Sequence, residues 1–294
     1  MSKELNFQIA SINFKYIFDY NCVLNECTPI NKFLLKKTEK NFDVINKIYK
    51  IKNNEFDIFL NKKPVLVTPA WSKYIINNEK YYLFHPNDAG NIAFIKCLYN
   101  EYIFLETYVI NMNYDIQPLP LCITGLLLQK KLCQLKRGLI MHGATLDIGG
   151  KGIVFTGNSG VGKSTLSNLC IKNISNVPIK RITDDRFILS IKDDKFYSYG
   201  NPLDSKIDNV NDLSVEINKI VFLHHGSENK ISKINSSEVF IRLFKIALLP
   251  YGDKKYLNEM LTYFKKMVNK IEFYDFYFIP TETAPLYLND NLLC

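Results

Sequence analysis

The chain has 294 residues, of which 47% are hydrophobic and 22% are charged, and its formal net charge is +8. This composition is typical of a globular protein with a sizeable core and excludes a disordered chain. Residues 1–10 lack the apolar run of a signal peptide, and the most apolar segment, residues 118–132, is too short to cross a membrane, so we expect a soluble, cytoplasmic protein.

The first part of the chain has β character. Short runs rich in Phe, Tyr, Ile and Val are separated by Asn, Asp, Pro and Gly, which are typical of turns. The clearest of these runs cover residues 5–18, 63–68, 80–86 and 101–110. We predict a β-rich N-terminal subdomain over residues 1–118, with a few helices and no catalytic motif.

An amphipathic helix is predicted next, over residues 119–136. Its apolar residues recur at helical spacing, basic residues gather near its end, and Gly138 marks the stop. We place the domain boundary before this helix, so that residues 119–294 form the second domain.

The second domain alternates strands and helices. Residues 138–156 contain two strand-like runs separated by a turn at 148–152 that includes Gly149-Gly150, and a glycine loop and a helix that begins near Ser164 follow. Further strands are predicted at residues 177–183, in a hairpin that turns at 192–195, at 217–225 and at 273–280. Helical spacing covers residues 236–250 and 253–272.

The glycine loop has the pattern G-x-x-x-x-G-K-S of a phosphate-binding loop. Its glycines let successive backbone N–H groups point into one concavity, which together with the helix N-terminus favours anions. Lys163 is long enough to reach the outer phosphates, and the hydroxyl of Ser164 suits Mg²⁺. We predict that ATP or GTP is bound by Gly157, Asn158, Ser159, Gly160, Val161, Gly162, Lys163, Ser164 and Thr165.

Two adjacent carboxylates, Asp184 and Asp185, follow a strand about twenty residues after the loop. One would bind Mg²⁺ while the other accepts a proton from an attacking hydroxyl, a division of labour typical of phosphoryl transfer. The alternative is an ordinary solvated turn before Arg186. His142 lies one strand upstream, and the residues alone leave open whether it reaches the phosphates.

In combination, these segments resemble the catalytic core of HPr kinase/phosphorylase and its relatives, which share a fold with the ATP-type phosphoenolpyruvate carboxykinases. The resemblance rests on "MHG", the hairpin, "GNSGVGKS" and "ITDD", with weaker likeness up to about residue 285. It implies an α/β fold with a P-loop core and a mixed sheet behind the β-rich N-terminal part. It also implies ATP and Mg²⁺ as cofactors, with Asp184, Asp185, His142 and Lys163 as catalytic residues and Ser164, Asp184 and Asp185 at the metal.

The chain departs from bifunctional HPr kinases in two places. Thr165 stands where those enzymes have Glu, and no Pro-Gly-Arg-Asn segment follows. These departures leave open whether the chain has phosphorylase activity and whether HPr is its substrate. The chain looks more like the stand-alone kinases of modified-peptide pathways, including those that phosphorylate the C-terminal serine of lasso precursor peptides.

The favoured function is an ATP-dependent kinase acting on a serine hydroxyl of a peptide or small protein. A kinase for a small molecule such as free serine, and a non-catalytic ATP-sensing module, are the alternatives. Nucleic acid is not an expected partner because the lysines are spread along the chain. The resemblance to HPr kinases, which are oligomeric, leaves open whether this chain forms a homo-oligomer. Arg181, Arg186, Arg242 and Lys206 remain open between a role at the phosphate and an ordinary salt bridge.

The seven cysteines are scattered, and no two of them form a C-x-x-C pair. We expect neither a disulfide framework nor a zinc site, and interpret them as small buried hydrophobic residues.

Overall fold

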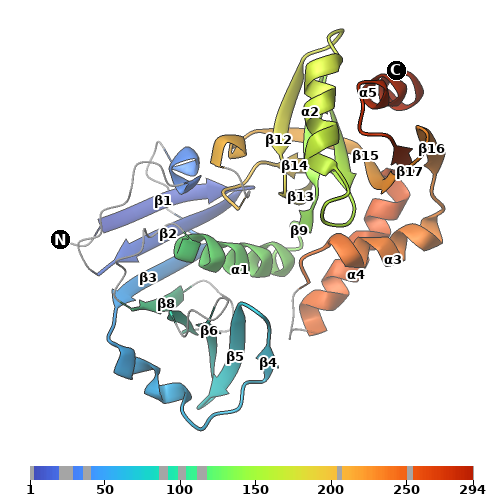
Figure 1. The fold of residues 1–294 in the computed structure, drawn as a ribbon. Coiled ribbons are helices and arrows are strands. Elements are labelled where there is room, and N and C mark those ends of the chain that lie inside the picture. Colours follow the sequence, from blue (N-terminus) through green and yellow to red (C-terminus); the bar gives the residue numbers. More distant parts are fainter. Residues whose placement is uncertain are drawn as a thin grey trace. The chain divides into compact units, whose positions relative to one another are not determined.

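The computed structural model describes residues 3–19, 29–35, 41–85, 92–98, 104–110, 118–203, 207–249 and 254–293. The chain forms two compact units, drawn in Figure 1. The N-terminal unit comprises residues 1–134 and 250–254, and the C-terminal unit comprises residues 135–249 and 255–294. Among the described residues, no helix is both long and apolar enough to cross a membrane.

The N-terminal unit is built on an eight-stranded sheet with the order β1-β2-β3-β8-β7-β6-β5-β4. Strand β3 is parallel to both of its neighbours, and the other neighbouring pairs are antiparallel. The strands are β1 (Lys3–Ile9), β2 (Ile12–Phe18), β3 (Val44–Lys50), β4 (Leu66–Val67), β5 (Trp71–Ile76), β6 (Glu79–Phe84), β7 (Ala93–Cys97) and β8 (Phe104–Val109). Two 3₁₀ segments, Pro29–Phe33 and Asn53–Phe59, accompany them. The predicted β-rich character is confirmed.

Helix α1 (Pro118–Gln134) belongs to this N-terminal unit. The buried hydroxyls of Tyr16 and Thr124 lie 2.7 Å apart, which joins α1 to β2. The Lys130 ammonium lies 5.9 Å from the centre of the Tyr82 ring on β6. The predicted helix therefore exists and packs on the N-terminal sheet, so the boundary between the two units follows this helix and does not precede it.

The C-terminal unit contains a nine-stranded sheet with the order β12-β10-β11-β15-β14-β13-β9, while β17 pairs with β15 and with β16. Its strands are β9 (Gly138–His142), β10 (Ala144–Ile148), β11 (Lys151–Thr156), β12 (Ile179–Thr183), β13 (Arg186–Lys192), β14 (Lys195–Tyr199), β15 (Ser214–His225), β16 (Lys230–Lys233) and β17 (Glu272–Phe278). Only β11–β15 and β15–β17 are parallel among these described pairs. The sheet is therefore mixed, as expected.

Helices cover both faces of this sheet. Helix α2 (Lys163–Asn173) and helix α5 (Thr283–Leu288) share a core with β11, β15 and β17, in which Phe155, Leu166 and Phe276 are fully buried. Helix α3 (Ser236–Ile246) and helix α4 (Lys254–Lys270) pack together through aromatic rings, and the Tyr263 hydroxyl of α4 donates to the Leu189 carbonyl of β13. The chain closes with a helical turn, Asn289–Leu293.

Two predicted hairpins are confirmed. Strands β10 and β11 join through Gly149-Gly150, and β13 and β14 through Asp193-Asp194, with positive φ at all four turn residues. Positive φ at both central residues is the signature of the type I′ turn, whose twist matches that of the flanking strands. The first predicted run of the β10–β11 hairpin forms two strands, of which β10 pairs with β11 as expected and β9 pairs with β13.

A candidate active site at the glycine loop

The glycine loop connects β11 to α2. Gly157, Gly160 and Gly162 have φ values of +143°, +78° and +103°, a region that other residues enter only with strain. Space is tight at two of them, since a Cβ on Gly157 would meet the Leu223 carbonyl at 3.1 Å, and one on Gly162 would meet the Phe278 ring at 2.9 Å. The glycines are therefore required by backbone shape and by close packing.

The side chains of the loop divide between core and solvent. Asn158, Ser159 and Gly160 are exposed at the tip, whereas Val161 is buried in the core shared with α2. Thr165 lies in the first turn of α2 with its side chain exposed. This arrangement anchors the loop from below and leaves its tip accessible to a ligand.

Lys163 begins α2 and folds back over the loop. Its ammonium donates to the carbonyl oxygens of Gly157 and Asn158, at 3.1 and 3.0 Å. Burial lowers the pKa of the Lys163 ammonium, and the carboxylates of Asp185 and Asp184 oppose that shift. A buried cation is thus held beside the loop by neutral carbonyl groups, which an anionic ligand can replace.

Asp184 is buried between α2 and the end of β12. The Ser164 hydroxyl donates to its Oδ2 at 3.0 Å, and the Arg181 guanidinium donates to its Oδ1 at 2.5 Å. Its side chain is only 2% exposed, so the charge is balanced by these partners instead of by water. The predicted metal-binding residues Ser164 and Asp184 therefore meet in the structure.

Asp185 has a different set of partners. Its Oδ1 lies 2.9 Å from Nε2 of His142, while the Arg186 guanidinium is 4.0 Å from its Oδ2. The hydrogen bond from His142 holds the pKa of the Asp185 carboxyl below its usual value, with smaller contributions from Arg186 and Lys163. The side chain is 28% exposed, so an incoming group can approach this carboxylate.

The strand pairing explains how His142 arrives there. His142 is the last residue of β9 and lies opposite Arg186 at the start of β13. The backbone N–H of Gly143 donates to the Asp185 carbonyl, and the Thr156 hydroxyl at the end of β11 donates to the His142 carbonyl. The imidazole is therefore fixed by contacts with both the acidic turn and the loop strand.

The site's oxygen donors suit Mg²⁺. A serine hydroxyl and a carboxylate oxygen lie 3.0 Å apart at the helix start, and both are the hard ligands that this ion prefers. Within the described ranges, no group of three or more His, Cys, Asp or Glu side chains could enclose a metal by itself. A site with one or two protein ligands is what Mg²⁺ uses when phosphates supply further oxygens.

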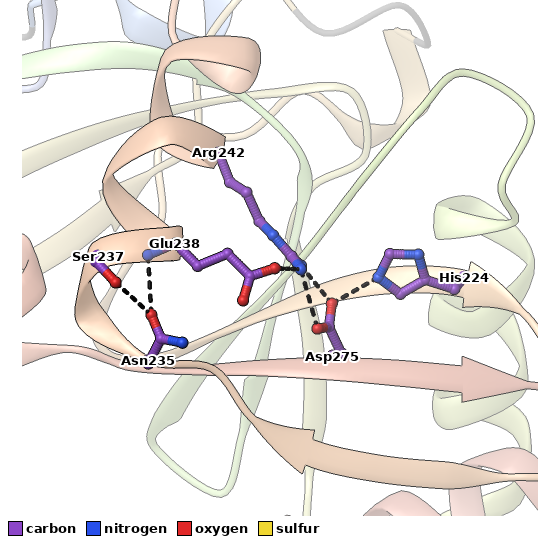
Figure 2. A network of polar contacts seen from close by, with 6 residues as sticks. All are labelled: His224, Asn235, Ser237, Glu238, Arg242 and Asp275. Atoms are coloured by element: carbon purple, nitrogen blue, oxygen red, sulfur yellow. Dashed lines mark hydrogen bonds and ion pairs between the residues drawn. The ribbon is translucent and has the colours of Figure 1, made fainter.

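Other residues that the sequence left open lie in separate places. Arg242 of α3 bonds Asp275 of β17, which also contacts His224 at the end of β15 (Figure 2). The same guanidinium contacts Glu238, so Arg242 is committed to an ion-pair network. Lys206 lies outside the described residues.

Sequence reasoning missed two contributors to the site. Asn168, one turn after Ser164 on α2, accepts a hydrogen bond from Arg181, and the Phe278 ring of β17 packs under Gly162. The i to i+4 spacing of Ser164 and Asn168 on a helix was the available signal for the first. The second depends on a strand 116 positions later in the chain, for which no local signal exists.

Fold and site together define a mixed α/β protein with a phosphate-loop-like segment beside an acidic turn. The chain matches no model of a known protein family and none of the curated proteins. Among solved structures, it is similar to the Hpr(Ser) kinase/phosphatase from Coxiella burnetii, with 14% identity over 51% of this chain and 91% of that chain, at a TM-score of 0.31. A likeness this distant leaves the chemistry of the site as the ground for any functional conclusion.

Proposed function

We propose that the chain is a Mg²⁺- and ATP-dependent kinase that transfers the γ-phosphate to a serine hydroxyl of a peptide or small protein. The observation that carries this proposal is the separation of roles between the adjacent carboxylates. Asp184 faces Ser164 at the helix start, whereas Asp185 faces His142. A site that only holds a nucleotide has no need of the second pair.

Each residue has a defined task in this proposal. The loop N–H groups and Lys163 bind the phosphates, and the attraction between the Lys163 ammonium and a phosphate is stronger in this buried position than in water. Ser164 and Asp184 would hold Mg²⁺, which when bound neutralises charge on the transferring phosphate. His142 orients the Asp185 carboxylate, which would accept the proton of the attacking hydroxyl.

The nature of the acceptor rests on a different ground. The serine hydroxyl and the peptide come from the resemblance of the motifs to the HPr-kinase-related enzymes, while the partly exposed Asp185 and the exposed loop tip give an acceptor access. The experiment therefore compares peptides with small hydroxyl compounds.

The test measures phosphate transfer by the full chain. The protein is incubated with γ-labelled ATP, Mg²⁺ and three acceptor sets: serine-containing peptides, including any encoded beside its gene; free serine; and simple sugars. We expect label on the peptide set. Asp185→Asn should lower transfer by roughly 10²- to 10⁴-fold while ATP binding is retained.

Asp193→Asn is the matched control, because Asp193 is an exposed aspartate in the β13–β14 turn. Its transfer rate should equal that of the unmodified chain. If free serine or a sugar carried the label, the acceptor would be a small molecule and the proposed peptide acceptor would be wrong. ATP turnover that survives both Asp184→Asn and Asp185→Asn without a phosphorylated product would refute the kinase, and tight ATP binding without turnover would indicate a sensor.

A further inference from the structure

An open chain of three hydrogen bonds links four polar side chains and joins α2 to β12 and to the turn that follows it. The Ser164 hydroxyl donates to Oδ2 of Asp184, and the Arg181 guanidinium donates both to Oδ1 of Asp184 and to Oδ1 of Asn168. Ser164 and Asn168 are four residues apart and therefore lie on one face of α2. Ser164 of the helix and Arg181 of the strand thus hold the carboxylate of Asp184, which follows the strand, and Asn168 holds Arg181.

A β-bulge makes this chain of hydrogen bonds possible. In β12, Thr183 pairs with Thr145 and Arg181 pairs with Leu146, so that Ile182 is an extra residue without a partner on β10. In a regular strand, residues 181 and 184 would point to opposite faces because side chains alternate. One extra residue restores the same side, and bulges beside active sites commonly re-aim a side chain in this way.

Arginine is the residue type that this geometry requires. Its planar guanidinium presents separate N–H groups in a fixed fork, so it can bind Asp184 through Nη1 and Asn168 through Nη2 at once. A lysine ammonium in the same place would be a point charge without a fixed direction. The Arg181 side chain is only 14% exposed, and its bond to Asp184 is partly buried, whereas its bond to Asn168 lies at the surface.

The consequence concerns the way in which Asp184 can meet a metal. Arg181 engages Oδ1, while Oδ2 faces the Ser164 hydroxyl. A carboxylate fixed in this way presents one oxygen beside Ser164 and is prevented from turning both oxygens to an ion. Mg²⁺ binds carboxylates through single oxygens at near-ideal octahedral geometry, whereas Ca²⁺ accepts bidentate carboxylates and irregular geometry.

We propose that Arg181 is a positioning residue that restricts Asp184 to one-oxygen binding and thereby makes the site select Mg²⁺ over Ca²⁺. The inference rests on the proposed function insofar as it uses the metal site at Ser164 and Asp184. Asn168 serves Arg181 by holding the far side of its guanidinium. If these hydrogen bonds had a merely structural role, they would stabilise the fold without affecting the preference for Mg²⁺ over Ca²⁺.

The experiment measures nucleotide affinity, not turnover. The dissociation constant of a fluorescent ATP analogue is determined with Mg²⁺ and with Ca²⁺ for the unmodified chain, Arg181→Met, Arg181→Lys and Asn168→Ala. Because loss of a residue that orients a metal ligand typically costs 10- to 100-fold in metal affinity, we expect Arg181→Met to reduce the Mg²⁺-over-Ca²⁺ preference by roughly tenfold. Arg181→Lys should resemble Arg181→Met, and Asn168→Ala should show a smaller loss.

Lys180→Met is the matched control, because it removes one positive charge from the exposed neighbouring position of the same strand. Its ion preference should equal that of the unmodified chain. Thermal unfolding is recorded for every variant, and Asn168→Ala, an exposed position, keeps the test informative if the Arg181 variants fold poorly.

The outcomes separate the two proposals. Equal Mg²⁺ preference in Arg181→Met and the unmodified chain overturns this inference and leaves the kinase standing. A preference lost in Arg181→Met, with no phosphorylated product from any acceptor, supports the inference and counts against the kinase. Nucleotide binding that ignores divalent ions in the unmodified chain overturns both.

Discussion

Gly162 offers a test of the way in which the glycine loop is built. Its φ of +103° lies in a region costly for any residue with a Cβ, and an added Cβ would approach the buried Phe278 ring to 2.9 Å. Gly160 shares the positive φ, at +78°, but an added Cβ there would meet nothing within 4 Å. The two glycines therefore separate backbone strain from steric overlap.

The magnitudes follow from these two terms. Left-handed strain costs about 1–2 kcal/mol for an L-residue, which is the expected destabilisation for Gly160→Ala. Overpacking a filled core adds about 1–3 kcal/mol, so Gly162→Ala should destabilise the chain by about 2–5 kcal/mol. Replacing the ring with a smaller side chain in Phe278→Leu should relieve the overlap. The double variant should therefore be more stable, by about 1 kcal/mol or more, than the sum of the two single effects predicts.

The assay is urea denaturation of the full chain, followed by far-ultraviolet circular dichroism, for the four members of the Gly162–Phe278 cycle and for Gly160→Ala. Equal destabilisation by Gly160→Ala and Gly162→Ala would refute the steric argument. Strict additivity of Gly162→Ala and Phe278→Leu would refute the specific role of the Phe278 ring.

Three further predictions concern other parts of the chain. Arg242→Met leaves the partly buried Asp275 without its main cation, and urea denaturation should show a loss of about 1–3 kcal/mol. Tyr16→Phe leaves the buried Thr124 hydroxyl without its partner and should cost about 1–2 kcal/mol by the same measurement, with little change in nucleotide affinity. Burial raises the pKa of the Cys170 thiol to about 12, so iodoacetamide at pH 8 should label it only after denaturation, as seen by peptide mass spectrometry; labelling in the native chain would contradict its burial.

The central part of the site could be predicted because its information is local. The strand, loop and helix around Lys163 form one continuous segment, and the pattern of glycines matches the backbone shape of the loop. The two type I′ hairpins could likewise be predicted from their pairs of turn residues. Local signals of this kind survive in the fold because they do not depend on which other segment packs nearby.

The N-terminal unit shows where such signals end. Aromatic and β-branched runs indicate strands, but the parallel pairing of β3 with β8 joins residues about sixty positions apart, and no turn residue encodes it. The same limit applies to α1. Its pattern of buried leucines shows that one face is covered, whereas the identity of the covering sheet depends on contacts such as Tyr16 with Thr124.

The acidic pair shows the limit most clearly. Asp184 and Asp185 are identical neighbours, and the sequence does not show which of them would hold the metal and which would accept the proton in the proposed reaction. Long-range partners make the distinction: Asp184 is drawn to Ser164 on α2, and Asp185 to His142 at the end of β9. The bulge at Ile182 adds Arg181 to the first of these sets, because it changes which side chains share a face. The motif therefore specifies that two carboxylates are present. The pairing of β9 with β13 and of β12 with β10, together with the position of α2, decides which partners each carboxylate has.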